Sequence, residues 1–163
     1  VKTNQTLVVK FPGHTEGLNT KLEAMKKTIA RLPLVYQVTF SGAVPGEEVA
    51  TFLSNRRTND ALKQNRLYEM LACDPDYVDA YGLQVVAGRN FSEDYGDDVD
   101  KLVINETAVR NLGFTSNDEA IGELVNVECT DAPMQIIGVV KDYHQQALSK
   151  NYTPIMLKFI WAL

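Results

Sequence analysis

Residues 124–140 have the sequence LVNVECTDAPMQIIGVV, in which two apolar runs flank a short polar segment. The first run covers residues 124–129 and the second covers residues 134–140, and both contain the β-branched residues that are typical of strands. Thr130-Asp131-Ala132-Pro133 lies between them and suits a four-residue hairpin loop. This stretch therefore predicts two antiparallel strands.

Further short strands are expected on both sides of this hairpin. Each is an apolar or β-branched run bounded by turn residues, and the last one follows Pro154. They are predicted at residues 64–72, 83–87, 102–104 and 155–160.

Helices are predicted where a capping residue precedes an apolar periodicity. Asn105 suits the N-cap of a helix over residues 106–112 that ends at Gly113. Asp74-Pro75 suits the start of a short helix that is stopped by Gly82, and a single helical turn is expected at residues 117–121.

The first 45 residues predict a β-α-β unit. Residues 6–11 and 34–41 have strand composition, and Thr20 with Glu23 forms a capping box for a helix that Pro33 ends. Residues 47–65 are polar and predict a loop at a domain boundary. Because several strands occur per helix in mixed order, the fold class is expected to be α+β.

Composition excludes some classes of function. The 163 residues include 16 Lys and Arg against 21 Asp and Glu, and the resulting net charge of −5 repels nucleic acid. Cys73 and Cys129 lack CxxC spacing, so a structural zinc site is not expected; two free buried thiols are favoured over one disulfide. The chain lacks an initiator Met and a signal sequence, so we expect it to be cut from a longer protein.

No motif predicts catalysis, a cofactor or a metal. Asp142, His144 and Ser149 lie too close in sequence for a hydrolytic triad without a nucleophile elbow, and His14 and His144 lack neighbouring ligands at metal spacing. The five carboxylates of residues 93–100 do not follow calcium-loop spacing and predict a solvated acidic loop. A P-loop is also missing.

Two groups of basic residues could contact lipid headgroups or a partner protein. One is on the predicted N-terminal helix and the other follows it, and a solvated face is the favoured interpretation of both. They comprise Lys26, Lys27, Arg31, Arg56 and Arg57.

Several short motifs occur in a recognisable order. After Leu34-Val35 and Pro45-Gly46 come Asp76-Tyr77, Tyr81-Gly82-Leu83, Ala87-Gly88-Arg89-Asn90-Phe91-Ser92, Val103-Ile104-Asn105-Glu106-Thr107-Ala108, Ala120-Ile121-Gly122 and Ile136-Ile137-Gly138-Val139-Val140-Lys141-Asp142-Tyr143-His144. Together they resemble the MacB-like periplasmic core domain of FtsX-type ABC transporter permeases. The resemblance spans roughly residues 34–154.

The resemblance implies a fold in three parts. A porter-like β-α-β half is expected at residues 1–55, an inserted mixed α/β subdomain, the sabre, at residues 56–152, and the truncated start of a second porter-like half at residues 153–163. In this arrangement the strand at residues 155–160 lies beside the strand at residues 6–11. We expect Met156, Phe159 and Trp161 to be covered by the N-terminal helix or by a neighbouring molecule.

The matched motif residues are expected to be structural. A bend, a cap or a close approach of backbones accounts for those that physical reasoning explains. They are Pro45, Gly46, Gly88, Arg89, Phe91, Asn105, Glu106, Gly122, Gly138, Asp142, His144 and Pro154.

The resemblance also implies a function and partners. The domain would lie on the periplasmic or extracytoplasmic side of a bacterial inner membrane, hydrolyse nothing itself and transmit conformational change to a substrate or partner protein. Its partners would be the membrane helices of the same permease, an ABC ATPase subunit or domain, a second permease copy and a periplasmic protein. The alternatives are a lipid- or peptide-binding module, which needs an apolar pocket, and a small hydrolase, which needs convergent polar residues.

Overall fold

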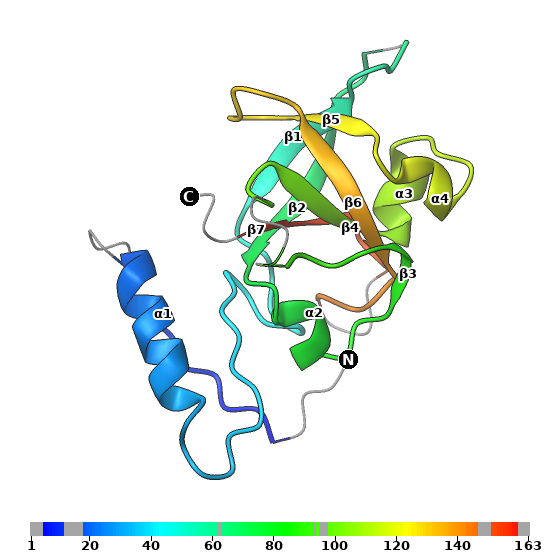
Figure 1. Ribbon diagram of the computed structural model, residues 1–163. Helices are drawn as coiled ribbons and strands as arrows, with labels where there is room; N and C mark the ends of the chain where they lie inside the picture. Colours follow the sequence, from blue (N-terminus) through cyan, green and yellow to red (C-terminus); the bar gives the residue numbers. More distant parts are fainter. Residues whose placement is uncertain are drawn as a thin grey trace.

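Seven strands form one sheet in the computed structural model, which describes residues 5–11, 18–61, 63–92, 94, 98–146 and 151–159 (Figure 1). The strand order is β3-β6-β4-β7-β2-β1-β5. The strands are β1 (Phe52–Arg57), β2 (Arg66–Cys73), β3 (Val85–Gly88), β4 (Lys101–Asn105), β5 (Leu124–Val127), β6 (Met134–Val140) and β7 (Ile155–Phe159). The α+β prediction is confirmed.

The sheet closes on itself. Because β5 pairs with both β1 and β6, the strands β6, β4, β7, β2, β1 and β5 form a ring, and β3 is added to the edge of β6. β7 is one of the strands of this ring and lies between β2, to which it is parallel, and β4, to which it is antiparallel. The expected pairing of residues 155–160 with residues 6–11 is therefore wrong.

The alternating side chains of the strands supply two apolar cores. In β7, Ile155, Leu157 and Phe159 join one core, whereas Met156 joins the other. The short helix α2 (Tyr77–Ala80) contributes to the first core, and α3 (Glu106–Asn111) and α4 (Asn117–Ala120) contribute to the second. Met156 and Phe159 are buried as expected, but the sheet's own cores cover them; Trp161 lies outside the described residues.

Local signals placed two helix starts correctly and two incorrectly. The turn expected at residues 117–121 is α4, which begins at Asn117. The Asn105 side chain accepts a hydrogen bond from the Ala108 N–H at 2.9 Å and caps α3 as predicted. The N-cap of α2 is Asp76, not Asp74. The helix α1 spans Leu18–Ile29, so it begins before the predicted cap Thr20 and ends before Pro33.

The N-terminal region lacks the predicted β-α-β unit. Residues 6–11 and 34–40 are not strands, and only a single bridge joins Ser41 to Cys73. Among the described residues, no strand pairs with residues 6–11, and residues 34–41 meet β2 only at Ser41. Propensity alone does not make a sheet. We call residues 5–11 and 18–46 the arm; in Figure 1 its helix α1 stands away from the sheet.

β1 occupies the middle of a segment that was predicted as a loop. Its polar residues Asn55, Arg56 and Arg57 concealed the strand, but Asn55 is fully buried and donates to the Met156 sulfur at 3.4 Å. We call residues 52–159 the sheet body. The sheet therefore crosses both expected domain boundaries, near residues 55 and 153.

Candidate functional site

The arm is fastened to the sheet body at Asp74, directly after β2. The Asp74 side chain is fully buried, and its Oδ2 accepts hydrogen bonds from Lys26 Nζ at 2.7 Å and from the Phe40 N–H at 3.1 Å. Its Oδ1 accepts from Thr39 Oγ1 at 2.5 Å. One carboxylate thus holds both the helix of the arm and the segment that returns from it.

Lys26 is the cation of this junction. It also pairs with Asp76, and only 21 % of its side chain is exposed. Burial by itself lowers the pKa of the Lys26 amine, but hydrogen bonds and charge interactions with Asp74 and Asp76 outweigh it and raise the pKa above its usual value. The prediction of a solvated helix face is wrong for Lys26, because its amine is bonded to Asp74 and Asp76. These partners lie about 50 residues away in the sequence, so no local pattern indicates them.

Backbone hydrogen bonds extend the junction along the end of β2. The Gly42 N–H donates to the Ala72 carbonyl at 2.8 Å, and the Asp74 N–H donates to the Phe40 carbonyl at 3.0 Å. Residues 40–42 therefore lie alongside β2, which is one of the strands of the ring.

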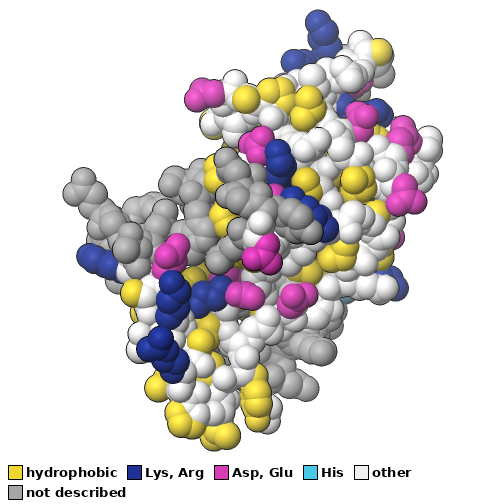
Figure 2. Space-filling model, in the orientation of Figure 1, with side chains coloured by type: hydrophobic (Ala, Val, Ile, Leu, Met, Phe, Trp, Pro, Cys, Tyr) yellow, Lys and Arg dark blue, Asp and Glu magenta, His cyan; other side chains and the backbone are white. Residues whose placement is uncertain are grey.

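The far end of the arm carries an apolar surface. Leu32 is 53 % exposed, Leu34 is 88 % exposed and Tyr36 is 94 % exposed. Figure 2 shows hydrophobic side chains gathered over this lower end of the molecule, with basic side chains above them along α1. The arm thus joins a buried attachment to the sheet body with an apolar tip.

Three of the expected motif residues form one hydrogen-bonded group at the start of α3. Besides capping α3, Asn105 accepts from the Ile155 N–H at 3.0 Å and donates to the Thr153 carbonyl at 2.8 Å. Glu106 accepts from the Asp142 N–H at 3.1 Å, and Asp142 accepts from the Thr107 N–H at 2.8 Å. These contacts join α3, the chain that follows β6 and the start of β7.

Gly88 and Gly138 lie where two backbones cross. A Cβ on Gly138 would overlap the Arg89 carbonyl oxygen, and a Cβ on Gly88 would overlap the Ile137 carbonyl oxygen. Gly88 also has a φ of +65°, a conformation that other residues rarely adopt. The glycines therefore allow β3 and β6 to approach closely enough for the Arg89 N–H to donate to the Ile137 carbonyl at 2.9 Å.

Arg89 is held by a carboxylate of the acidic loop. Both Arg89 terminal nitrogens bond Asp98 at 2.8 Å, and the Ser92 N–H donates to the same carboxylate at 3.0 Å. The prediction of a solvated loop is wrong for Asp98, whose side chain is 2 % exposed. The hydrogen bonds from Arg89 are the main cause of the lowered pKa of Asp98, and the Ser92 N–H adds to them. Burial raises the pKa but is outweighed.

We expect Asp98→Asn to destabilise the protein by about 1–3 kcal/mol at neutral pH, because it removes charged hydrogen bonds from a buried position. The pKa of Asp98 is lower in the folded state, so its contribution is present above the unfolded-state pKa and is lost as pH falls through the folded-state pKa. Urea unfolding at several pH values should therefore show the two proteins converging in acid. Asp100→Asn, at a carboxylate that is 61 % exposed, is the control, and an equal loss there would contradict the assignment.

The other expected motif residues occupy turns and packing positions. Gly46 donates its N–H to the Gln145 carbonyl at 2.7 Å, next to Pro45, and Gly122 donates to the Ile136 carbonyl at 2.8 Å. Phe91 packs on Phe159 with ring centroids 5.8 Å apart, and His144 packs on Tyr152 at 4.5 Å. The Pro154 carbonyl accepts from the Glu69 N–H at 3.0 Å.

The side chain of Gln145, which no sequence motif marks, connects several of these turns. Gln145 is 1 % exposed and donates to the Val44 carbonyl at 2.9 Å and to the Glu47 carbonyl at 3.2 Å. Its Oε1 accepts from the Tyr77 hydroxyl at 3.3 Å. No local signal marks it, because all of its partners are distant in the sequence.

The described candidates for chemistry, Asp142 and His144, have different partners. Asp142 bonds Thr107 and Arg110, whereas His144 stacks on Tyr152; Ser149 and His14 lie outside the described residues. Among the described residues, no group of three or more His, Cys, Asp or Glu side chains could hold a metal, and no helix is long and apolar enough to cross a membrane. Both cysteines are free; Cys73 is buried as expected, but Cys129 is exposed.

One family model matches nearly the whole chain. The sequence matches the MacB-like periplasmic core domain over residues 3–159. No curated protein matches the chain.

Several solved structures share the fold. They include the extracellular domain of the noncanonic ABC-type transporter YknZ from Gram-positive bacteria (TM-score 0.59, 19 % identity, 85 % of this chain and 62 % of that chain). The periplasmic region of MacB from Actinobacillus actinomycetemcomitans has a TM-score of 0.55 and 20 % identity over 86 % of this chain and 55 % of that chain. A domain of a putative permease protein from Porphyromonas gingivalis has a TM-score of 0.57 and 16 % identity over 85 % of this chain and 57 % of that chain.

The chain thus spans little more than half of the length of these structures. The family match covers nearly all of the chain, including the arm, the junction at Asp74 and the sheet body. This chain belongs to the MacB-like periplasmic core domain family and is an extracytoplasmic domain.

Proposed function

We propose that this domain is a non-catalytic part of an ABC transporter permease and transmits conformational change from the membrane to a substrate or partner protein. The family match over residues 3–159 is the observation that carries this proposal. ATP hydrolysis would take place in a separate domain or chain, and the permease would work as a pair of copies. The motif residues from Pro45 to Pro154 would serve the fold, not a reaction.

The architecture supports a mechanical role. The arm is held by Asp74 at the end of β2, and β2 is part of a closed ring of strands. Hydrogen-bonded rings resist deformation because shifting one strand requires its neighbours to shift in register. A displacement of the arm would therefore move the sheet body as a unit. The division into porter-like and inserted parts remains a proposal.

The parent reading frame gives the first test. The permease proposal requires a stretch of about 20 apolar residues before Val1 and three such stretches after Leu163. A parent protein without these stretches would contradict the permease assignment.

Spin labels on the full-length protein would test the transmission itself. Cys129 is exposed and Cys73 is buried, and burial raises the pKa of the Cys73 thiol well above its usual value, so Cys129 should react selectively within this domain. We expect the distance between the Cys129 labels of two paired copies to change between the nucleotide-free and ATP-trapped states. Cys129→Ser is the labelling control. An unchanged distance in a protein with intact ATPase activity would contradict transmission through this domain.

The lipid- or peptide-binding alternative requires an apolar pocket. The two pockets described in this structure are lined mainly by charged and polar side chains, one beside the turn between β1 and β2 and one beside Asp76 and Arg89. They do not favour the binding of an acyl chain or an apolar peptide.

A further inference from the structure

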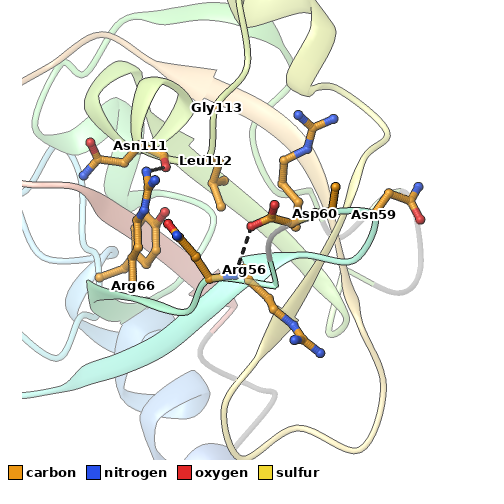
Figure 3. A pocket seen from close by; sticks show the side chains of 11 residues that line it. Arg56, Asn59, Asp60, Arg66, Asn111, Leu112 and Gly113 are labelled. Atoms are coloured by element: carbon orange, nitrogen blue, oxygen red, sulfur yellow. Dashed lines mark hydrogen bonds between the residues drawn. The ribbon is translucent and has the colours of Figure 1, made fainter.

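A basic pocket of about 280 Å³ lies at the turn between β1 and β2, against the end of α3 (Figure 3). Its lining residues include Arg56, Arg57 and Arg66 against the single acidic residue Asp60, and Figure 3 shows the Arg56 guanidinium directed away from Arg66 and Asn111. A water molecule occupies about 30 Å³ in the liquid, so the pocket has room for a group several times that size. This local excess of positive charge occurs in a chain with a net charge of −5.

Two of these arginines are held in place by the sheet body. Arg66 donates to the backbone carbonyl of Asn111, and Figure 3 shows Arg66 beside Asn111. The guanidinium carbon of Arg57 lies 3.9 Å from the centre of the Phe114 ring, and its nearest carboxylate oxygen, on Glu123, is 3.6 Å away. Their charged groups are therefore positioned before any ligand arrives.

Two buried donors of the pocket have no hydrogen-bond partner. Tyr68 is 1 % exposed, and its hydroxyl is unpartnered; the Nε of Arg57 is also buried and unpartnered. A buried polar group without a partner costs free energy, and native proteins keep only a few per 100 residues, so each calls for an explanation. Burial raises the pKa of Tyr68 to about 12, so the hydroxyl keeps its proton at neutral pH and can donate.

We propose that this pocket binds a phosphate group, with Arg57, Arg66 and the Tyr68 hydroxyl as its donors. Guanidinium groups match the geometry of phosphate oxygens, and charge-assisted hydrogen bonds from both arginines would supply the affinity. The phosphate could be free in solution or belong to a lipid headgroup. The proposal concerns this chain alone and does not depend on the transmission function.

The test compares thermal stability and calorimetric binding of the 163-residue chain with inorganic phosphate, using acetate at equal ionic strength as the charge control. We expect phosphate to raise the melting temperature and acetate to have little effect. Tyr68→Phe and Arg66→Gln should each weaken phosphate binding by roughly tenfold or more, since each removes a hydrogen bond to a charged group. Lys63→Gln removes one positive charge from the same turn but not from the pocket lining, and it should bind like the wild type.

The stability of the ligand-free Tyr68→Phe protein separates binding from folding. Because the hydroxyl is buried without a partner, its removal should leave the free energy of unfolding unchanged or raise it while phosphate binding falls.

Phosphatidylcholine vesicles with and without phosphatidic acid distinguish a lipid headgroup from a free phosphate ion. Binding to the acid-containing vesicles alone would identify a headgroup, and binding of inorganic phosphate would identify a free anion. The proposal would be overturned if neither inorganic phosphate nor the acid-containing vesicles bound. It would also be overturned if Lys63→Gln and Arg66→Gln lost binding equally.

Discussion

Replacement of Asp74 by alanine is expected to lower the free energy of unfolding by about 3–5 kcal/mol, a loss typical of breaking a buried ion pair from one side. The Lys26 amine would lose its most buried partner, and the Thr39 hydroxyl and Phe40 N–H would lose their acceptor. Urea unfolding followed by circular dichroism measures the loss. Proteolysis should also cut the arm sooner, because its attachment depends on this carboxylate.

Asp76→Ala is the matched control for the junction. Asp76 pairs with the same amine, but its side chain is 45 % exposed, so the expected loss is under about 1 kcal/mol. Equal losses in the two variants would show that the buried position of Asp74 is not what holds the arm.

Gly138→Ala is expected to destabilise the protein by about 3 kcal/mol or more. The new methyl group would overlap the Arg89 carbonyl oxygen and lie 3.0 Å from its carbonyl carbon, and backbone atoms cannot move aside as a flexible side chain can. In an unobstructed strand, replacing glycine by alanine raises the free energy of unfolding by about 0.5–1 kcal/mol. The sign of the measured change in stability therefore distinguishes the two cases. The midpoint of urea unfolding gives the measurement.

Gly42→Ala provides the comparison. A Cβ at Gly42 would meet its nearest atom at 3.8 Å, in ordinary contact, so the expected change is within about 0.5 kcal/mol. A Gly138→Ala protein as stable as Gly42→Ala would mean that β3 and β6 do not cross as described.

Features with a local cause were predictable from the sequence. The cap formed by Asn105 needs only the following turn of helix and was predicted correctly. The antiparallel pairing of β5 with β6 was also predicted, but Val125 pairs with Met134, so the connection is longer than the predicted four-residue loop. The family motifs also identified the fold, because their order spans most of the chain.

Features with distant causes were not predictable. Residues 6–11 have strand composition but find no partner, whereas β1 is a strand because β2 and β5 pair with it on both sides. The partner of Lys26 and the unpartnered hydroxyl of Tyr68 depend on which residues the sheet brings together. Neither can be inferred from spacing along the chain.

The place of β7 in the ring has a consequence for synthesis on the ribosome. Glu69 of β2 is paired with Ile155 of β7, and Ile104 of β4 is paired with Met156, so β7 separates two strands that are made much earlier. Until it emerges, β2 and β4 each have an open edge that can pair with another nascent chain. Closing so long a loop is slow, so we expect the ring of strands to close only after β7 has been synthesised and the open edges to favour aggregation until then.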